Sequence, residues 1–199
     1  LDPALQLMNL YGSVGGRSRN GWGSYSLQRI DGVDTPTSST PTQALAKCLS
    51  MDWPHALGAD SQGALVWQTV PHKDWAGLMR TLAEIKIKLR TQAAFKFPHA
   101  QPDGQVHDRH WLSYPITRHD VNDWKRKHLR LPNQLRLKVR HTDDGLVGVI
   151  FHMPHLPPAE FRPDPKTLES IWRTVHSHLG AYEKPTPENA HLQLKRTAA

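Results

Sequence analysis

Residues 135–153, LRLKVRHTDDGLVGVIFHM, carry the pattern that decides the fold. Apolar residues and cations alternate along the first half, which is the period of a strand that buries one face. The apolar residues are Leu135, Leu137 and Val139, and the cations are Arg136, Lys138 and Arg140. Residues 146–151 are almost wholly apolar and predict a strand at the centre of its sheet. The sequence TDDG at 142–145 predicts a tight hairpin turn between the two strands.

The three cations of this stretch fall on one side of the first strand. Side chains on one face of a strand lie about 7 Å apart, close to the spacing of phosphates on an extended nucleic-acid strand. We therefore expect Arg136, Lys138 and Arg140 to form an exposed cationic sheet face that contacts RNA.

Two helices and three further strands are expected around the hairpin. Helical spacing of apolar residues predicts one helix over 75–89, capped by Asp74, and another over 165–182, capped by Asp164. The remaining strands are expected at 25–30, 64–70 and 111–117. The order of these elements is that of an α+β, ferredoxin-like (RRM-like) module, an antiparallel sheet with helices on one face.

Composition divides the chain into segments. Residues 31–43 are rich in Ser, Thr and Pro and predict a linker, and residues 44–183 hold the expected α+β domain. Residues 184–199 are polar with little to bury, so we expect a flexible tail. Residues 1–30 contain the end of an amphipathic helix and a glycine-rich loop.

The overall charge and the cysteine content narrow the classes of function. A formal net charge of +7 in 199 residues favours a polyanionic partner. The single cysteine, Cys48, excludes an internal disulfide framework and is expected to be buried in a short helix. No apolar run is long enough for a membrane span and no signal peptide is visible, so we expect a soluble, cytoplasmic protein without a membrane partner.

Residues 12–24, GSVGGRSRNGWGS, form the glycine-rich loop. The spacing of its glycines fits neither a Walker A loop nor a dinucleotide-binding fingerprint. Glycines let the backbone approach a phosphate, Arg17 and Arg19 supply charge, and Trp22 offers a stacking face. The alternative is a connection that only turns the chain. For Trp22 itself we expect packing beneath the loop rather than stacking on a base.

The stretch LMNLYGSVGGRSRNGWGSYSL resembles the helix, glycine-rich loop and strand of the CRISPR-associated RAMP superfamily. The positions that fit its pattern are Gly15, Gly16, Arg17, Ser18, Arg19, Gly21, Trp22, Gly23 and Ser24. Asn20 departs from it, because the family often has a second arginine there. The runs RHWLSYPI, LRLPNQLRLKV and VGVIFHMPHLP are similar to one subgroup, the large RAMP subunit that caps the crRNA 3′ side of the type III-B Cmr effector complex.

This resemblance implies a non-catalytic RNA-binding subunit in antiviral defence. Its partners would be crRNA, target RNA and other RAMP subunits, with the glycine-rich loop holding RNA. Residues 1–30 would then be the end of a first RAMP unit, whose beginning precedes the sequence given.

Two other functions stay open. One is a metal-independent RAMP endoribonuclease that processes guide RNA with a histidine as general base. The other is a DNA-binding or ribosome-associated basic protein. The histidine pairs His107/His110 and His152/His155 have ligand-like spacing but no cysteine partner, so we expect neither a metal nor another cofactor.

Residues 118–130, RHDVNDWKRKHLR, form a second candidate RNA contact. Five cations surround Trp124, and they are Arg118, Lys125, Arg126, Lys127 and Arg130. Basic residues with an aromatic among them are typical of single-strand binding, although most such runs are solvated surface.

Overall fold

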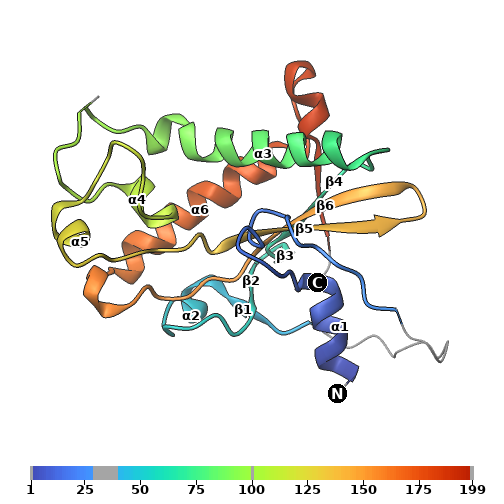
Figure 1. Cartoon of the computed structure of the whole chain (residues 1–199), viewed down its shortest axis with the longest axis horizontal. Helices are drawn as coiled ribbons and strands as arrows, with labels where there is room; N and C mark the ends of the chain where they lie inside the picture. Colours follow the sequence, from blue (N-terminus) through green and yellow to red (C-terminus); the bar gives the residue numbers. More distant parts are fainter. Residues whose placement is uncertain (1, 29–39, 100, 198–199) are drawn as a thin grey trace.

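A four-stranded antiparallel sheet with the order β5-β6-β4-β7 forms the centre of the molecule (Figure 1). The computed structural model describes residues 2–28, 40–99 and 101–197. The strands are β4 (Val66–Thr69), β5 (Leu135–Thr142), β6 (Gly145–His152) and β7 (Leu194–Arg196). Along the chain the elements of this module follow the order β4-α3-β5-β6-α6-β7. The fold is therefore of the α+β class.

The predicted hairpin is confirmed as β5 and β6. The two strands pair from Leu135 with His152 to Thr142 with Gly145. Gly145 closes the turn with a φ of +128°, a conformation that residues with a Cβ avoid. β6 lies between β5 and β4, so its apolar run is central as expected. The alternate apolar residues of β5 are 6–7% exposed and belong to the main core.

Helices α3 (Trp75–Thr91) and α6 (Pro165–Ala181) cover one face of the sheet. Both predicted caps are confirmed: Asp74 accepts a hydrogen bond from Gly77 N at 2.8 Å, and Asp164 accepts one from Thr167 N at 2.9 Å. The apolar stripes of both helices share one core with Leu137, Ile150 and Trp67 of the sheet. The exception is Trp75, the first residue of α3, which is 37% exposed.

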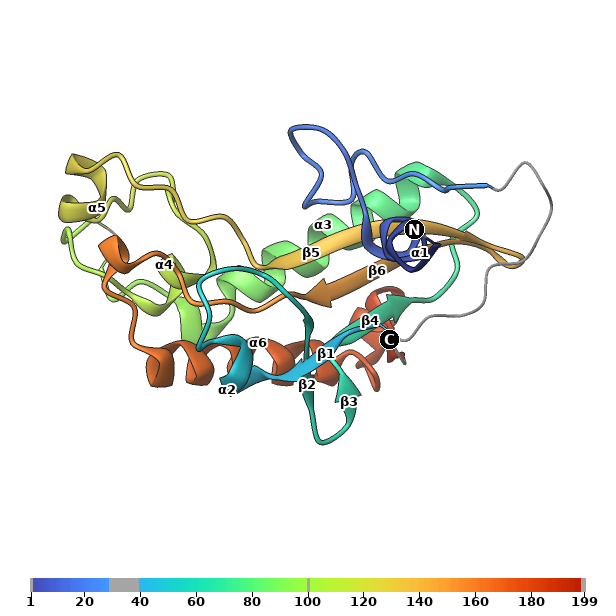
Figure 2. The same cartoon turned by 90° about the horizontal axis from the view of Figure 1, so that it is seen from below.

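The opposite face of the sheet is also covered. Helix α1 (Asp2–Tyr11) lies across the β5–β6 hairpin, and Figure 2 shows it end-on against that hairpin. Tyr11 contacts Phe151 of β6 with ring centroids 5.1 Å apart. A second sheet is formed by β1 (Thr42–Ala44), β2 (Leu57–Asp60) and β3 (Gly63–Ala64). Its residues Leu57 and Ala64 pack with Phe151 in a second, smaller apolar cluster on this face. Helix α2 (Leu45–Cys48) follows β1, and Cys48 is buried as predicted.

Two of the predicted strands differ from the structure. The strand expected at 111–117 is wrong, because residues 108–112 form helix α4 (Asp108–Leu112) and Tyr114 makes only an isolated bridge to Leu131. A short apolar run does not distinguish a strand from a buried helical turn, and contacts with Trp124 favour the turn here. Residues 25–28 lie in no strand, and residues 29–30 and 31–39 are outside the described part of the chain. The last two residues of the expected linker, 42 and 43, belong to strand β1 (Thr42–Ala44).

Three short 3₁₀ helices and one further α-helix complete the described chain. They are η1 (Ala93–Phe95), α5 (Asn122–Arg126), η2 (Ala159–Phe161) and η3 (Pro187–Leu192). Within residues 2–28, 40–99 and 101–197 no helix is long and apolar enough to cross a membrane.

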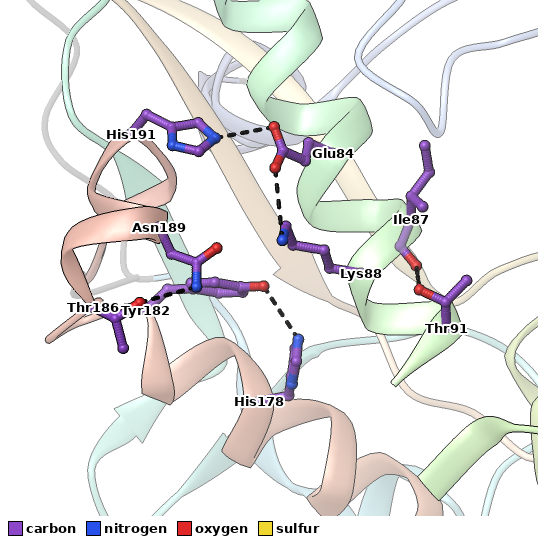
Figure 3. Close-up of polar contacts among 9 residues, drawn as sticks. All are labelled: Glu84, Ile87, Lys88, Thr91, His178, Tyr182, Thr186, Asn189 and His191. Atoms are coloured by element: carbon purple, nitrogen blue, oxygen red, sulfur yellow. Dashed lines mark hydrogen bonds and ion pairs between the residues drawn. The ribbon is translucent and has the colours of Figure 1, made fainter. Parts of the chain in front are cut away.

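The expectation that residues after 183 have little to bury is wrong. Leu192 and Leu194 are 0% and 2% exposed, and β7 pairs with β4 from Trp67 to Thr69. One ion pair joins η3 to α3, because a carboxylate oxygen of Glu84 lies 3.0 Å from His191 Nε2 (Figure 3). The other oxygen pairs with Lys88 Nζ within α3 at 3.7 Å. Two leucines among polar residues gave too short a pattern to predict a strand, and it is the pairing with β4 that buries them.

Replacing Leu192 tests whether the C-terminal segment belongs to the core. We expect Leu192→Ala to lower the free energy of unfolding by about 2–5 kcal/mol, because a fully buried leucine is removed. Lys195→Ala on exposed β7 surface is the control and should change it by less than about 0.5 kcal/mol. Urea denaturation measures both. Equal, small effects would show that this segment does not contribute to the core.

Candidate nucleic-acid interface

The glycine-rich loop lies along β5, which is an edge strand of the central sheet. Leu137 N donates a hydrogen bond to Arg19 O at 3.0 Å, and Asn20 forms a parallel bridge with Leu137. Val139 N donates to Ser24 Oγ at 2.9 Å. The loop therefore occupies donors that an edge strand would otherwise leave exposed, and its position relative to the sheet is fixed.

Lys138 and Arg140 hold the end of α1 and the start of this loop. Lys138 Nζ donates to Gly12 O at 2.6 Å and to Met8 O at 3.4 Å. Arg140 donates from Nε and Nη2 to Leu10 O at 2.9 and 2.6 Å. These carbonyls belong to the last turn of α1 and the residue after it, where free carbonyls and the helix dipole favour cations.

The expected exposed cationic sheet face is therefore wrong. Lys138 is 1% exposed, and Arg136 and Arg140 are only partly exposed. The alternation correctly placed the three cations on the face opposite the main core, but α1 and the loop cover that face. Burial, and secondarily Arg140, lower the pKa of Lys138 to about 8.

A cationic cleft of about 520 Å³ lies between the loop, α3 and the start of β5. Five of the residues that line it are cations: Arg17, Arg19, Lys86, Arg90 and Arg136. An adjoining cleft shares Lys86 and Arg90 with it and adds Arg109 of α4. None of the described residues that line either cleft is acidic.

No carboxylate among the described residues forms an ion pair with the cations of these two clefts. Burial lowers the pKa of Lys86, Arg90 and Arg136, and a neighbouring cation lowers each further, namely Arg90, Arg109 and Arg19 respectively. The buried Nε atoms of Arg90, Arg109 and Arg136 have no hydrogen-bond partner in the described chain. Buried charges are normally paired, so this arrangement fits an anion that binds in the cleft.

The loop also presents backbone donors to the cleft. Turn hydrogen bonds join Ser18 N to Gly15 O and Asn20 N to Arg17 O. Within residues 2–28, 40–99 and 101–197 no acceptor is found for the backbone N–H of Gly16 or Arg17. Free N–H groups next to arginines are typical of phosphate-binding loops.

The expectation that Trp22 packs beneath the loop is wrong, because its side chain is 48% exposed. The residue of this turn that is buried is Gly21, which has a φ of +86° and lies against Met79 and Leu82 of α3. The backbone turn at Gly21 directs the next side chain outward. Trp22 then meets Trp75 edge to face, with ring centroids 6.1 Å apart.

Some of the other predicted loop residues are exposed to solvent, and others maintain the shape of the loop. Gly15, Gly16 and Arg17 are exposed and Ser18 is partly so. Gly23 approaches the backbone of Val14 so closely that a side chain there would clash. The loop therefore keeps its shape through glycines and exposes its arginines.

The second predicted RNA contact, residues 118–130, lies apart from the cleft residues. Lys125 pairs with Asp120 at 2.6 Å, and Arg126 and Lys127 pair with Asp123 at 2.6 and 2.8 Å. Arg118 and Arg130 are exposed. Trp124 is 2% exposed and packs against other aromatic rings, so its expected place within an RNA-binding patch is wrong. RNA contact by the five cations stays a prediction.

The histidine pairs form contacts within the protein. His107 lies 2.8 Å from Asp103, and His110 Nδ1 accepts a hydrogen bond from His107 N. His152 Nδ1 lies 2.9 Å from His176 Nε2, and burial lowers the pKa of His176 to about 3. Among the described histidines, cysteines and acidic residues, no group of three or more is arranged to hold a metal ion.

The residues that sequence reasoning did not assign to the site are Lys86, Arg90 and Arg109. The first two were visible as cations on the polar side of the 75–89 helix, but periodicity alone does not say which element faces that side. Comparison of the chain with protein-family models, curated proteins and solved structures gave no match. The function must therefore be inferred from the cleft itself, which supplies N–H donors and charge for a polyanion.

Removing one cleft cation should stabilise the protein without ligand. We expect Arg90→Met and Arg136→Met each to raise the free energy of unfolding by about 1 kcal/mol, because each removes a partly buried, unpaired charge from a repulsive cluster. Arg80→Met, on the exposed surface of α3, is the control with the same change in net charge. The gain should shrink in high salt. Destabilisation in both cleft variants relative to Arg80→Met would contradict an uncompensated cluster.

The pKa of Lys138 predicts a pH dependence of stability. Its value falls from 10.5 in the unfolded chain to about 8 in the folded protein, so the unfolded state binds more protons between these values. Wild-type stability should therefore rise, relative to Lys138→Met, as the pH increases from about 8 to about 10, by at most about 1.4 kcal/mol per pH unit. Urea unfolding of both proteins across this range measures the difference. A pH-independent difference would mean that Lys138 titrates alike in both states.

Proposed function

We propose that this chain binds single-stranded RNA in the cationic cleft and acts as a non-catalytic subunit of a type III CRISPR effector complex. In this proposal it contacts crRNA, target RNA and neighbouring RAMP subunits in the cytoplasm. The observation that carries the proposal is the cluster of unpaired cations around the glycine-rich loop, with three buried Nε atoms that lack a partner in the described chain.

A polymer of phosphates suits this cluster better than a small anion. The two adjoining clefts gather six cations from the loop, α3, α4 and β5, namely Arg17, Arg19, Lys86, Arg90, Arg109 and Arg136. A single phosphate neutralises only one or two of them. A nucleic-acid backbone offers successive charges, and each phosphate contact gains free energy from released counterions.

The fold supports a ferredoxin-like assignment within this proposal. The element order β4-α3-β5-β6-α6-β7 and the sheet order β5-β6-β4-β7 are those of a split βαβ unit. RRM-type modules of this architecture stack bases on the open sheet face. Here α1 and the second sheet cover that face, so we assign RNA binding to the loop at the edge of β5, where the RAMP-like sequence also lies.

The salt dependence of RNA binding tests this assignment. Each phosphate contact with single-stranded RNA contributes a slope of about −0.7 to log affinity against log salt. Changing Arg17 and Arg19 together to Ala should therefore flatten the slope by about 1.4 while leaving the melting temperature unchanged, because both side chains are exposed. The double variant Lys184→Ala/Lys195→Ala is the control, with the same charge loss on exposed residues outside the cleft.

The length of the RNA recovered after the binding measurements tests the non-catalytic role. We expect the RNA to be recovered intact. Specific cleavage that one His→Ala change abolishes would support a metal-independent RAMP endoribonuclease instead. If the salt slope is unchanged in both the Arg17/Arg19 variant and the control, the cationic cleft does not bind RNA.

A further inference from the structure

An apolar cleft of about 470 Å³ adjoins the cationic one. Trp22 lines one side, and Met79, Ala83 and Ile87 of α3 line the other. Ile87 is 60% exposed, although it lies on a helix whose other apolar residues are mostly buried. Asn20, Lys86 and Arg90 line both clefts, so a ligand can contact the two at once.

We infer that the apolar cleft takes one unpaired base of the bound RNA, stacked on Trp22, and that it prefers uracil to cytosine. This inference rests on the proposed function, because the phosphates on either side of the base would occupy the cationic cleft. Nearly half of the Trp22 side chain is exposed, and its edge-to-face contact with Trp75 orients the ring. An exposed, oriented indole beside phosphate-binding residues is the arrangement that binds single-stranded bases.

The preference for uracil follows from the hydrogen-bonding groups of the residues where the two clefts meet. Asn20 Oδ1 accepts a hydrogen bond from Lys86 Nζ at 2.6 Å. Since an ammonium group can only donate, this contact fixes the amide orientation and leaves Asn20 Nδ2 as a donor. Lys86, Arg90 and Arg109 are donors only. A base edge rich in acceptors therefore fits. Uracil O2 and O4 offer four lone pairs beside a single N–H at position 3, whereas cytosine O2 and N3 offer three lone pairs beside the two N–H groups of its amino group.

Acceptors for an amino group are scarce at this position. Thr91, the hydroxyl residue of the cleft, donates its proton to Ile87 O at 2.9 Å. Glu84 is the acidic residue of α3 and lies on the other side of the helix, toward Lys88 and His191 (Figure 3). Among the described lining residues, the side-chain acceptors left for a base are Thr91 Oγ1 and the second lone pair of Asn20 Oδ1, against donors on five side chains, namely Asn20, Trp22, Lys86, Arg90 and Arg109.

Binding of short labelled U-only, C-only and abasic-substituted U oligonucleotides tests the inference. Wild-type protein should bind the U oligonucleotide several-fold more tightly than the C oligonucleotide, and the abasic one more weakly than either. Trp22→Ala should weaken U binding by about 5- to 150-fold and leave little difference between U and abasic RNA. Trp22→Phe should retain most of the affinity. Trp53→Ala, at a tryptophan that is 54% exposed and outside the cleft, is the matched control and should bind as wild type.

The outcomes separate this inference from the proposed function. If the Arg17/Arg19 variant loses salt slope while Trp22→Ala binds as wild type, RNA binding stands and the base site is wrong. If neither variant weakens binding, both are wrong. Should Trp22→Ala fail to fold, the wild-type protein decides: equal affinity for U and abasic RNA overturns the base site. Equal affinity for U and C overturns the preference for uracil.

Discussion

Two side chains of β5 fix the positions of helix α1 and of the glycine-rich loop that follows it. Lys138 and Arg140 donate to the carbonyls of Met8, Leu10 and Gly12 at the end of α1. Burying Lys138 costs solvation free energy, which its lowered pKa reflects, and the carbonyls and the helix dipole offset that cost. Because α1 ends on the sheet in this way, the glycine-rich loop must begin there, and it then follows the edge of β5 toward α3.

The cations that have no ion-pair partner among the described residues are a consequence of that placement. The loop brings Arg19 near Arg136, while α3 brings Arg90 near Arg109, and each neighbour lowers the pKa of a partly buried guanidinium. Repulsion of this kind destabilises the folded protein. The free energy gained by burying the two apolar clusters must offset it for the protein to stay folded. A bound polyanion removes the repulsion. Ligand affinity and instability of the free protein thus arise from the same charges.

The sequence predicted those parts of the fold that local chemistry decides. The β5–β6 hairpin, the caps Asp74 and Asp164 and the buried Cys48 each depend on a few neighbouring residues. Strand β7 was missed because its pairing with β4 lies more than a hundred residues away in sequence. The cations of β5 were placed on the correct face but called exposed, since alternation gives the side of a strand and not what covers it. The two adjoining clefts combine residues of four elements, so periodicity within one element did not reveal them.

Covering both faces of the sheet changes where such a module can bind RNA. In the described part of the chain, helices α3 and α6 pack on one face and α1 with the second sheet packs on the other, so neither face resembles the open stacking surface of an RRM-type sheet. The sheet still has two edges, β5 and β7, and an open edge at β5 would offer its backbone to any other strand. The glycine-rich loop pairs with that edge and so closes it to strand addition. By lying there it replaces the backbone groups of β5 with arginines, free amides and Trp22, which are groups that recognise a nucleotide chain.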